Sequence, residues 1–439
     1  MSKTYQKTTR RDERDPQDAG QIAVPEQVIV SLAGIAESAK EGLLALSAGV
    51  GLQVMYQIMN EDVAALCGPR GQHNGDRAGY RHSTGAGSVT LGGRRVPVTR
   101  PRVRAVDGSG ELHLPSYGLF SSAEILGQMA LERMLAGLSS RRYPAGLEPV
   151  GTAIGARPAS TSKSAVSRRF VAATETALTG LLSRRLDDLD LVAFLVDGVH
   201  FGEHCCVVAL GIGIDGTKHP LSLAEGSTEN KTLVTGLITD LRDRGLDVTR
   251  PVLAVIDGSK ALAAAIRAVF DKPIIQRCQE HKLRNVIDKL PDRLRQVTQR
   301  RMRQAYHAAS ALQAEGQLTE LAAELDKTHP GAAASLREGM AETLSILALG
   351  VPPTLARTLR STNSIESMIG ICRDHSRNVK NWRDGTMALR WCAAGMLEAD
   401  HQFRRVNGHL HLTKLRAALE HRFTENVPAI NNHETVNAA

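Results

Sequence analysis

Two uninterrupted apolar runs stand out along the chain, and each of them ends in an Asp-Gly pair. Residues 191–196 (LVAFLV) precede Asp197 and Gly198, and the run PVLAVI precedes Asp257 and Gly258. Runs without alternation are typical of strands that are buried on both faces. If the two strands are neighbours, their terminal carboxylates lie side by side and form a site for a divalent metal. Asp-Gly is also a common turn signal, so a simple turn is the alternative at either position.

The pattern between residues 190 and 290 predicts a mixed sheet with flanking helices. After the first Asp-terminated strand, the apolar runs Cys205–Ile214 and His219–Ala224 are separated by a tight turn, which predicts three antiparallel neighbours. Helical periodicity covers Glu229–Gly245 and Ser259–Phe270, the second Asp-terminated strand lies between these helices, and a last strand is expected at Pro273–Arg277. The order β-β-β-α-β-α-β is typical of a ribonuclease-H-like α/β core. In that core the first and fourth strands are adjacent, as the aspartate pair requires.

The N-terminal part of the chain predicts a helical unit followed by an arginine-rich hairpin. Residues 1–24 are polar and resemble a disordered lead-in, whereas residues 25–68 have the apolar faces of helices. Within residues 69–120, two alternating runs around Gly92-Gly93 predict a β-hairpin. Eight arginines and one acid lie in residues 70–104, so the ribbon is either a solvated basic face or, as we expect, a phosphate-contacting surface. The arginines predicted to contact DNA are Arg77, Arg81, Arg94, Arg95, Arg100, Arg102 and Arg104.

Residues 121–185 return to helical periodicity and include a segment similar to a helix-turn-helix. A first helix is expected to end near Gly155, Pro158 lies in the turn, and Ser160 to Ser162 supply an N-cap for the second helix. In a major groove, the second helix would offer hydrogen-bond donors to phosphates and base edges. Its predicted DNA contacts are Lys163, Ser167, Arg168 and Arg169. Helix pairs rich in Ser, Lys and Arg are common, so this pattern alone is not specific.

A Cys-x-x-His pair and a late glutamate are further candidates for the region of the two aspartates. Cys278 and His281 have the spacing of two zinc ligands, but no partner pair is obvious, so a structural role in the strand-to-helix turn is the better interpretation. A helix capped by Ser361 or Thr362 carries Glu366 just off its apolar stripe. Glu366 therefore either points toward the aspartates or is an ordinary solvated residue. Downstream cations that could meet a phosphate backbone are Arg373, Arg377 and Lys380.

The helical pattern also predicts how the C-terminal half is divided. Residues 291–357 are helical throughout and predict an all-helical insertion between two parts of the sheet domain, 190–290 and 358–405. Residues 406–439 are expected to form a helical C-terminal tail.

Composition favours a nucleic-acid partner and a cytoplasmic location. Lys and Arg number 54 against 46 Asp and Glu, and the resulting net charge of +8 favours a polyanionic partner. Aromatic residues are only 3% of the chain, which disfavours the base-stacking platforms of single-strand-binding proteins. Six scattered cysteines suit a reducing cytosol. The N-terminal residues lack an apolar leader and no run of 18 apolar residues occurs, so we expect neither secretion nor membrane insertion.

Five motifs occur in an order and spacing that match a known family. They are DRAGYRHS (76–83), DGVH (197–200), VIDGSKAL (255–262), RCQEHKLRNVIDKLP (277–291) and RSTNSIES (360–367). With these motifs, the chain resembles the Mutator-type transposases of bacterial insertion sequences, which are members of the DDE transposase superfamily. The resemblance covers residues from about 40 to 410. One departure is Gln279, which replaces the aromatic residue that usually follows the Cys of the Cys-x-x-His element.

The resemblance implies that Asp197, Asp257 and Glu366 are an acidic triad, with the helical insertion inside the interval of 109 residues (366 − 257) between the last two. It also implies that His281, and less directly Cys278, lie close to the site, and His200 of the second motif is a further near-site candidate. Oxygen ligands suit Mg²⁺ or Mn²⁺, and two ions are expected, with Asp197 bridging them and each of the other acids completing one.

The implied activity is metal-dependent cleavage and joining of double-stranded DNA by a homo-oligomer. The expected substrates are the terminal inverted repeats of the element and a target DNA. Two alternatives stay open. A ribonuclease-H-like nuclease would cleave without joining, and would have little need for a large DNA-binding half. A non-catalytic DNA-binding regulator would gain nothing from clustered acids facing DNA, and it would act without divalent metal.

Overall fold

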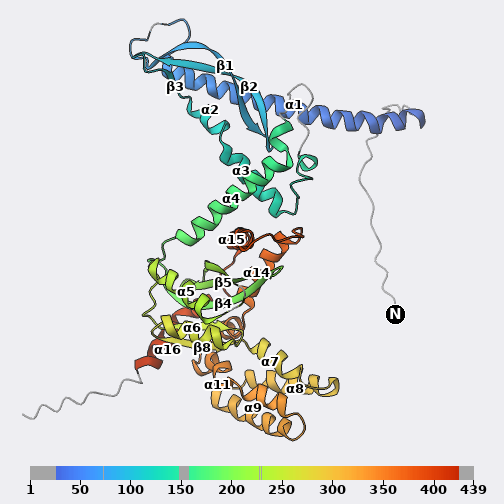
Figure 1. Ribbon diagram of the computed structural model, residues 1–439, viewed down its shortest axis with the longest axis vertical. Helices are drawn as coiled ribbons and strands as arrows, with labels where there is room; N and C mark the ends of the chain where they lie inside the picture. The colour runs from blue at the N-terminus through green and yellow to red at the C-terminus, as the bar shows by residue number, and fades with distance from the viewer. Residues whose placement is uncertain (1–25, 73, 148–157, 227, 229, 425–439) are drawn as a thin grey trace, which may run out of the picture. The chain divides into compact units, whose positions relative to one another are not determined.

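The computed structural model describes residues 26–72, 74–147, 158–226, 228 and 230–424 as a mixed α/β protein. These residues form two compact units, each with its own β-sheet (Figure 1). Three predictions lie wholly or partly outside the described residues: the disordered lead-in, the first helix of the helix-turn-helix, and the end of the C-terminal tail.

The first unit combines one long helix with a three-stranded antiparallel sheet. Its elements are α1 (Glu26–Cys67), β1 (Gly79–Leu91), β2 (Arg94–Ala105), β3 (Glu111–Leu112) and α2 (Pro115–Phe120). The predicted hairpin is confirmed and is longer than the pattern indicated, with Gly92 and Gly93 providing the positive φ angles of its turn. Val63 and Cys67 of α1 pack with Val103 of β2 in its core. Neither α1 nor any other helix in the described ranges is long and apolar enough to cross a membrane.

The second unit contains the central sheet and the remaining helices. The strands are β4 (Leu191–Phe201), β5 (His204–Gly213), β6 (Lys218–Gly226), β7 (Val252–Ile256) and β8 (Pro273–Arg277). The helices are α3 (Ala123–Leu135), α4 (Lys163–Ser183), α5 (Lys231–Asp243), α6 (Lys260–Val269), α7 (Gln279–Ile287), α8 (Asp292–Tyr306), α9 (Ala311–Asp326), α10 (Pro330–Arg337), α11 (Met340–Thr343), α12 (Ser345–Ala348), α13 (Pro353–Leu359), α14 (Asn363–Ser376), α15 (Gly385–Gln402) and α16 (Leu412–Thr424). Short 3-10 turns lie at Pro144–Gly146, Pro158–Thr161 and His409–His411.

The central sheet has the strand order β6-β5-β4-β7-β8. β5 pairs antiparallel with both β6 and β4, whereas β4, β7 and β8 run parallel to one another. The predicted pairing of the first strand with the fourth is therefore confirmed, because β4 and β7 are hydrogen-bonded neighbours.

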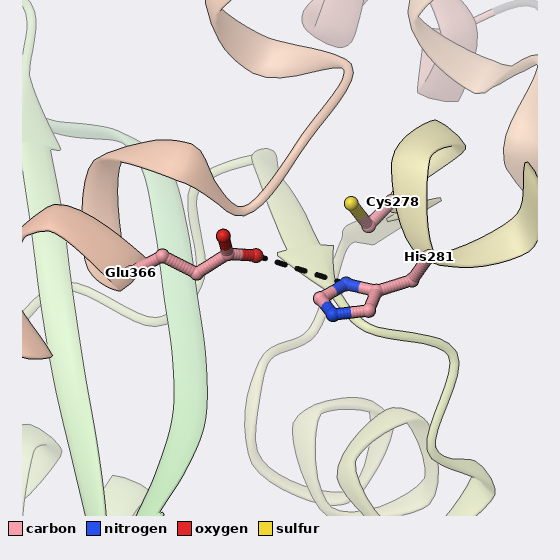
Figure 2. Close-up of side chains that lie close together, drawn as sticks. All are labelled: Cys278, His281 and Glu366. Atoms are coloured by element: carbon pink, nitrogen blue, oxygen red, sulfur yellow. Dashed lines mark ion pairs between the residues drawn. The ribbon is translucent and has the colours of Figure 1, made fainter. Parts of the chain in front are cut away.

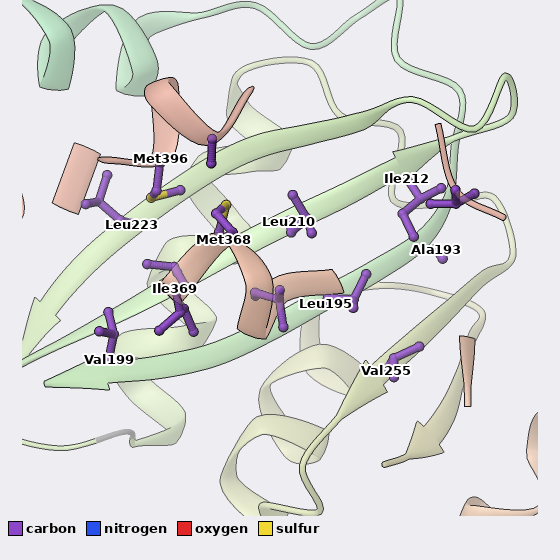
Figure 3. Close-up of a cluster of buried hydrophobic side chains, with 14 of the residues drawn as sticks. Ala193, Leu195, Val199, Leu210, Ile212, Leu223, Val255, Met368, Ile369 and Met396 are labelled. Atoms are coloured by element: carbon purple, nitrogen blue, oxygen red, sulfur yellow. The ribbon is translucent and has the colours of Figure 1, made fainter. Parts of the chain in front are cut away.

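Both faces of this sheet are buried, as the unalternating apolar runs predicted. In β4, Ala193 and Leu195 contribute to the core on one face, together with α14, α15 and α16 (Figure 3). Phe194 and Val196 contribute to the core on the other face, which α5 and α6 cover. The alternation follows from the two-residue period of a strand. The same rule assigns Leu253 and Val255 of β7 to the α14 face, in agreement with the clusters.

Within the second unit, the helices after the last strand share a hydrophobic core of their own. Side chains from α7, α8, α9 and α10 pack together around residues such as Leu283, Met302 and Leu318. α11 and α12 contact β8 at the edge of the sheet. The helical pattern predicted after residue 291 is thus confirmed. Lys282 of α7 is buried and donates hydrogen bonds to the carbonyls of Ser335 and Glu338, which link α7 to the end of α10.

α16 is an integral part of the core, although its sequence was interpreted as part of a tail. Leu412, Leu415 and Leu419 are fully buried against the α14 face of the sheet. Arg416 donates to the carbonyls of Leu191 and Pro251, where β4 and β7 begin. α16 therefore binds the end of the sheet where β4 and β7 begin, opposite to the end that carries the two aspartates.

A capping residue sets the start of α15, and its removal gives a small testable effect. The Asp384 carboxylate accepts a 2.7 Å hydrogen bond from the backbone N–H of Met387. We expect Asp384→Ala to lower the free energy of unfolding by about 1 kcal/mol. Asp384→Asn should retain most of the stability because Asn caps helices equally well. Urea unfolding of the three proteins measures the difference, and equal stability of the Ala and Asn variants would contradict the capping role.

Candidate active site

Asp197 lies within β4, and Asp257 directly follows β7, the parallel neighbour of β4. The register pairs Leu195 with Val255, and two residues further along each strand are Asp197 and Asp257. Continued alternation directs both carboxylates to the face of the sheet that α14 covers. Asp197 accepts a hydrogen bond from the N–H of Gly198 at 2.9 Å, and Asp257 accepts one from Ser259 at 2.8 Å. Both side chains are half-buried.

Glu366 projects from the first turns of α14 into the same region. The apolar stripe of α14, with Met368 and Ile369, packs on the sheet as predicted (Figure 3). Glu366 lies off this stripe and its side chain is 36% exposed. A pocket of about 390 Å³ has Asp197 and Glu366 in its wall. Its other lining residues are Gly198, His281, Arg284, Ile369 and Arg373.

The Cys-x-x-His turn connects the strand that carries Asp257 to the helix that carries Glu366. The backbone N–H of Cys278 donates to the carbonyl of Ile256 at 2.7 Å, directly before Asp257. The next N–H, of Gln279, donates to the carbonyl of Arg360 at 2.9 Å, just before α14. From the same turn, Nδ1 of His281 lies 3.8 Å from Oε1 of Glu366 (Figure 2). The turn therefore joins the end of β7 to the segment just before α14.

Thr362 links the polar groups of this region, and the sequence pattern identified it only as a possible cap. Its hydroxyl donates to Oε1 of Glu366 at 2.5 Å, one helical turn away. The same oxygen lies 3.4 Å from Sγ of Cys278 and 3.4 Å from Nδ1 of His281. Thr362 is fully buried and makes no side-chain capping bond to the helix backbone. A hydroxyl has one proton and two acceptor sites, so it can donate to Glu366 and accept from its neighbours.

The surroundings of Cys278 and His281 shift their pKa values in opposite directions. The hydrogen bond with Cys278 raises the pKa of His281 above its usual value, and the negative charges of Glu366 and Asp197 add to the effect against the opposing influence of burial. Burial alone would raise the pKa of the Cys278 thiol, but hydrogen bonds with His281 and Thr362 outweigh it, so the net shift is downward. Both shifts favour a charged pair beside the acids.

The donor atoms fit hard divalent cations better than zinc. Within the described ranges, Cys278, His281 and Glu366 are the one group of three potential ligands whose donor atoms all lie within 4.8 Å of one another. In this group the Thr362 hydroxyl already binds the glutamate oxygen, which explains the cluster without a metal. Carboxylate oxygens suit Mg²⁺ or Mn²⁺. Of the three predicted acids, Asp197 and Glu366 line the pocket, whereas Asp257 is not among its lining residues.

Two arginines give the pocket positive charge next to its acids. Arg373 was predicted from the sequence to meet a phosphate, and it lies in the pocket wall. Arg284 was missed, although it follows His281 by three residues on α7, and a spacing of three brings side chains to the same helix face. The pocket thus presents carboxylates and guanidinium groups together.

A profile of the family described as Transposase, Mutator family matches residues 25–406, which include all of these site residues. The chain belongs to the Mutator family of transposases. Its relatives carry corresponding names. The transposase for insertion sequence element ISRM5 of Rhizobium meliloti (strain 1021) is 25% identical over 370 residues, which cover 83% of this chain and 90% of that protein.

Two further relatives of this Mutator-family chain match over shorter stretches. The transposase for insertion sequence element IST2 of Acidithiobacillus ferrooxidans is 29% identical over 177 residues, or 40% of this chain and 59% of that protein. The transposase for IS6120 of Mycolicibacterium smegmatis is 28% identical over 253 residues, or 56% of this chain and 75% of that protein.

The arginines of the hairpin in this Mutator-family chain differ in whether other protein groups already bind them. Arg100 and Arg102 both form ion pairs with Glu111, and their hydrogen bonds, that of Arg102 above all, lower the pKa of Glu111 to about 2. Arg81 donates to the carbonyl of Gly68, and Arg77 stacks on the ring of Tyr80. Arg104 is exposed, and Arg94 and Arg95 are half-buried. The sequence pattern did not foresee that one glutamate would engage two of these arginines.

The remaining predicted residues lie in the second unit. α4 begins after the N-cap Ser162, as predicted, with Lys163 and Arg168 exposed and Ser167 half-exposed, whereas Arg169 donates to the carbonyl of Ser160 at 2.5 Å. Arg377 and Lys380 follow Arg373 and are exposed. His200 is exposed near the end of β4, and strand alternation directs it to the face opposite to Asp197.

Proposed function

We propose that the chain is a DDE transposase that binds the terminal inverted repeats of an insertion sequence and catalyses metal-dependent cleavage and transfer of DNA strands. One observation carries the proposal: Asp197 and Glu366, 169 residues apart (366 − 197), line one pocket, and the strand register pairs Leu195 with Val255, which lie two residues before Asp197 and Asp257. Family membership supports the reaction class.

A ribonuclease-H-like fold for the catalytic unit forms part of the proposal. The strand order β6-β5-β4-β7-β8, with β5 antiparallel to its neighbours and the rest parallel, supports it. We further propose that residues 190–290 and 358–405 form this core, and that residues 291–357 are inserted into it. Residues 25–68, 69–120 and 121–185 would then be DNA-binding regions.

Asp197, Asp257 and Glu366 would hold Mg²⁺ or Mn²⁺, with two ions expected. When bound, such ions activate a water or a 3′-hydroxyl as nucleophile and stabilise the leaving oxygen. The protein's contribution is to hold three carboxylates on one side of a rigid sheet, so that little reorganisation precedes reaction. Thr362 fixes one oxygen of Glu366, and the hydrogen bond with Cys278 raises the pKa of the neighbouring His281, which favours its protonated form.

The pocket arginines give the site affinity for DNA in spite of its acids. Arg284 and Arg373 lie in the same wall as Asp197 and Glu366, so their guanidinium groups are available to phosphate oxygens. Arg377 and Lys380 extend the basic surface beyond α14. On the DNA-binding regions, the exposed Arg104, Lys163 and Arg168 are the stronger candidates, whereas Arg100 and Arg102 must share Glu111 with DNA.

Transposition requires two element ends and a target, so we propose that the chain acts as a homo-oligomer on double-stranded DNA in the cytoplasm.

The decisive experiment uses purified chain and a labelled duplex carrying the element's own end. With Mg²⁺ or Mn²⁺ we expect nicking at the end, and joining of the freed 3′-end to a second duplex. A chelator should abolish both reactions and leave DNA binding intact. Cleavage without joining would favour the nuclease alternative. Binding without cleavage in either metal would favour the regulator and overturn the proposal.

A further inference from the structure

Charge in the helical insertion is divided between two adjacent helices. α8 contains five arginines and a single acid, Asp292, whereas α9 contains four acids and no basic residue. One ion pair joins the two helices, between Arg301 and Glu324. Mixed charges on both helices would be expected of an ordinary solvated surface, so the segregation calls for a partner that prefers the α8 side.

The outward face of α8 carries donors along its whole length. The opposite face packs into the insertion core through Thr298, Met302 and Ala305. The outward face contains one apolar side chain, Val297, and otherwise residues that hydrogen-bond phosphates. These residues are Arg293, Gln296, Arg300, Arg303, Gln304 and His307. They recur every three or four positions, so they form one stripe about 21 Å long.

Two cations of this stripe, Arg293 and Arg300, are available to a ligand. Arg295 pairs with Asp292 and Arg301 with Glu324, but both lie on the flanks of the stripe. Arg303 approaches Glu280 only to 3.7 Å. Arg293 and Arg300 are exposed, and within the described parts of the chain neither forms an ion pair.

The stripe is physically continuous with the candidate active site. At its C-terminal end, the ring of His307 bonds to the carbonyl of Arg303 through Nδ1, at 2.7 Å. Its Nε2 accepts a 2.9 Å hydrogen bond from Arg360. Arg360 lies two residues before Thr362, whose hydroxyl holds Glu366. The hydrogen bonds of His307 and Arg360 therefore bring the C-terminal end of α8 to the segment that begins α14.

We propose that the outward face of α8 binds the phosphate backbone of duplex DNA that leaves the active site. The inference rests on the proposed function and extends it by giving the insertion a DNA-binding role. The duplex comes from one of two sources, the element's own end or the DNA beyond the cleavage position, and the chemistry of the contact is the same for both.

Salt dependence of binding tests the contact without requiring activity. For Arg293→Gln/Arg300→Gln we expect the slope of log affinity against log salt to fall by about 2, and affinity near 0.1 M salt to fall by about ten-fold or more. The matched control is Arg404→Gln/Lys414→Gln. It removes the same charge from exposed residues near the end of the sheet where β4 begins. Equal slopes for the two double variants would overturn the proposal.

Two duplexes identify the source of the bound DNA. One ends at the cleavage position, and the other continues for about 20 base pairs beyond it, roughly two helical turns and more than the stripe can span. A binding defect confined to the longer duplex assigns the contact to DNA beyond the cleavage position, and an equal defect on both assigns it to the element's end. If the wild type binds but nicks neither duplex in metal, the proposed function fails, while the comparison of slopes still decides the role of α8.

Discussion

Replacing any one acid of the proposed triad by its amide is expected to reduce strand cleavage at least about 10³-fold, which corresponds to about 4 kcal/mol of transition-state stabilisation. Asp197→Asn and Glu366→Gln keep the shape of each side chain but remove the charge that a metal ion requires. In Asp197→Asn the amide oxygen can still accept the hydrogen bond from the N–H of Gly198, so the fold should be preserved. DNA binding should be unchanged or slightly tighter, because a negative charge facing phosphates is lost.

The same helix provides a control for the glutamate. Asp374 is exposed on α14, eight residues after Glu366, and does not line the pocket. Asp374→Asn should cleave like the wild type. A Glu366→Gln variant that cleaves normally would place the third acid elsewhere and refute the triad. Asp197→Asn tests the acid that the central sheet positions.

The central sheet was predictable because each of its strands is marked by an apolar run in the sequence. The runs ending at Asp197 and Asp257 are buried on both faces, as a run without polar alternation requires. The turn-and-helix order then restricted the connections enough to predict that β4 and β7 are neighbours. The apolar stripe of α14 was likewise predicted from the spacing of its apolar residues.

Contacts between distant segments were not predictable in this way. Glu366 was one of several helix-surface acids until the family resemblance singled it out, because periodicity does not tell which strand end a helix faces. Arg284 and Thr362 are about 80 residues apart in the sequence (362 − 284), and only the folded chain brings both of them to the site. Arg100 and Arg102 were interpreted as DNA contacts because their partner Glu111 lies eleven and nine residues away, respectively, and on another strand. α16 was interpreted as part of a tail because its periodicity does not show that Arg416 bonds to the segments where β4 and β7 begin.

The second large effect is expected at Thr362. Its hydroxyl holds one oxygen of Glu366, and residues that orient a metal ligand typically contribute 10- to 100-fold to metal affinity or activity. We expect Thr362→Val, which has nearly the same shape, to lower cleavage by about that factor. The loss should be partly recovered at high Mn²⁺, because the glutamate keeps its charge and loses only its fixed orientation. Cleavage measured against Mn²⁺ concentration gives the apparent metal affinity directly.

A positioning role and a purely structural role of Thr362 predict different patterns. Thr362→Ser retains the hydroxyl and should restore the metal affinity of the wild type, although it removes a buried methyl group and so costs some stability. Thr358→Val, on α13, removes a hydroxyl that donates to the carbonyl of Asn407, and it should leave the metal dependence unchanged. If instead metal affinity follows thermal stability across the three variants, with the Ser protein as impaired as the Val protein, Thr362 acts only through packing. If the Ser protein is less stable but binds metal normally, the hydroxyl itself orients Glu366 for metal binding.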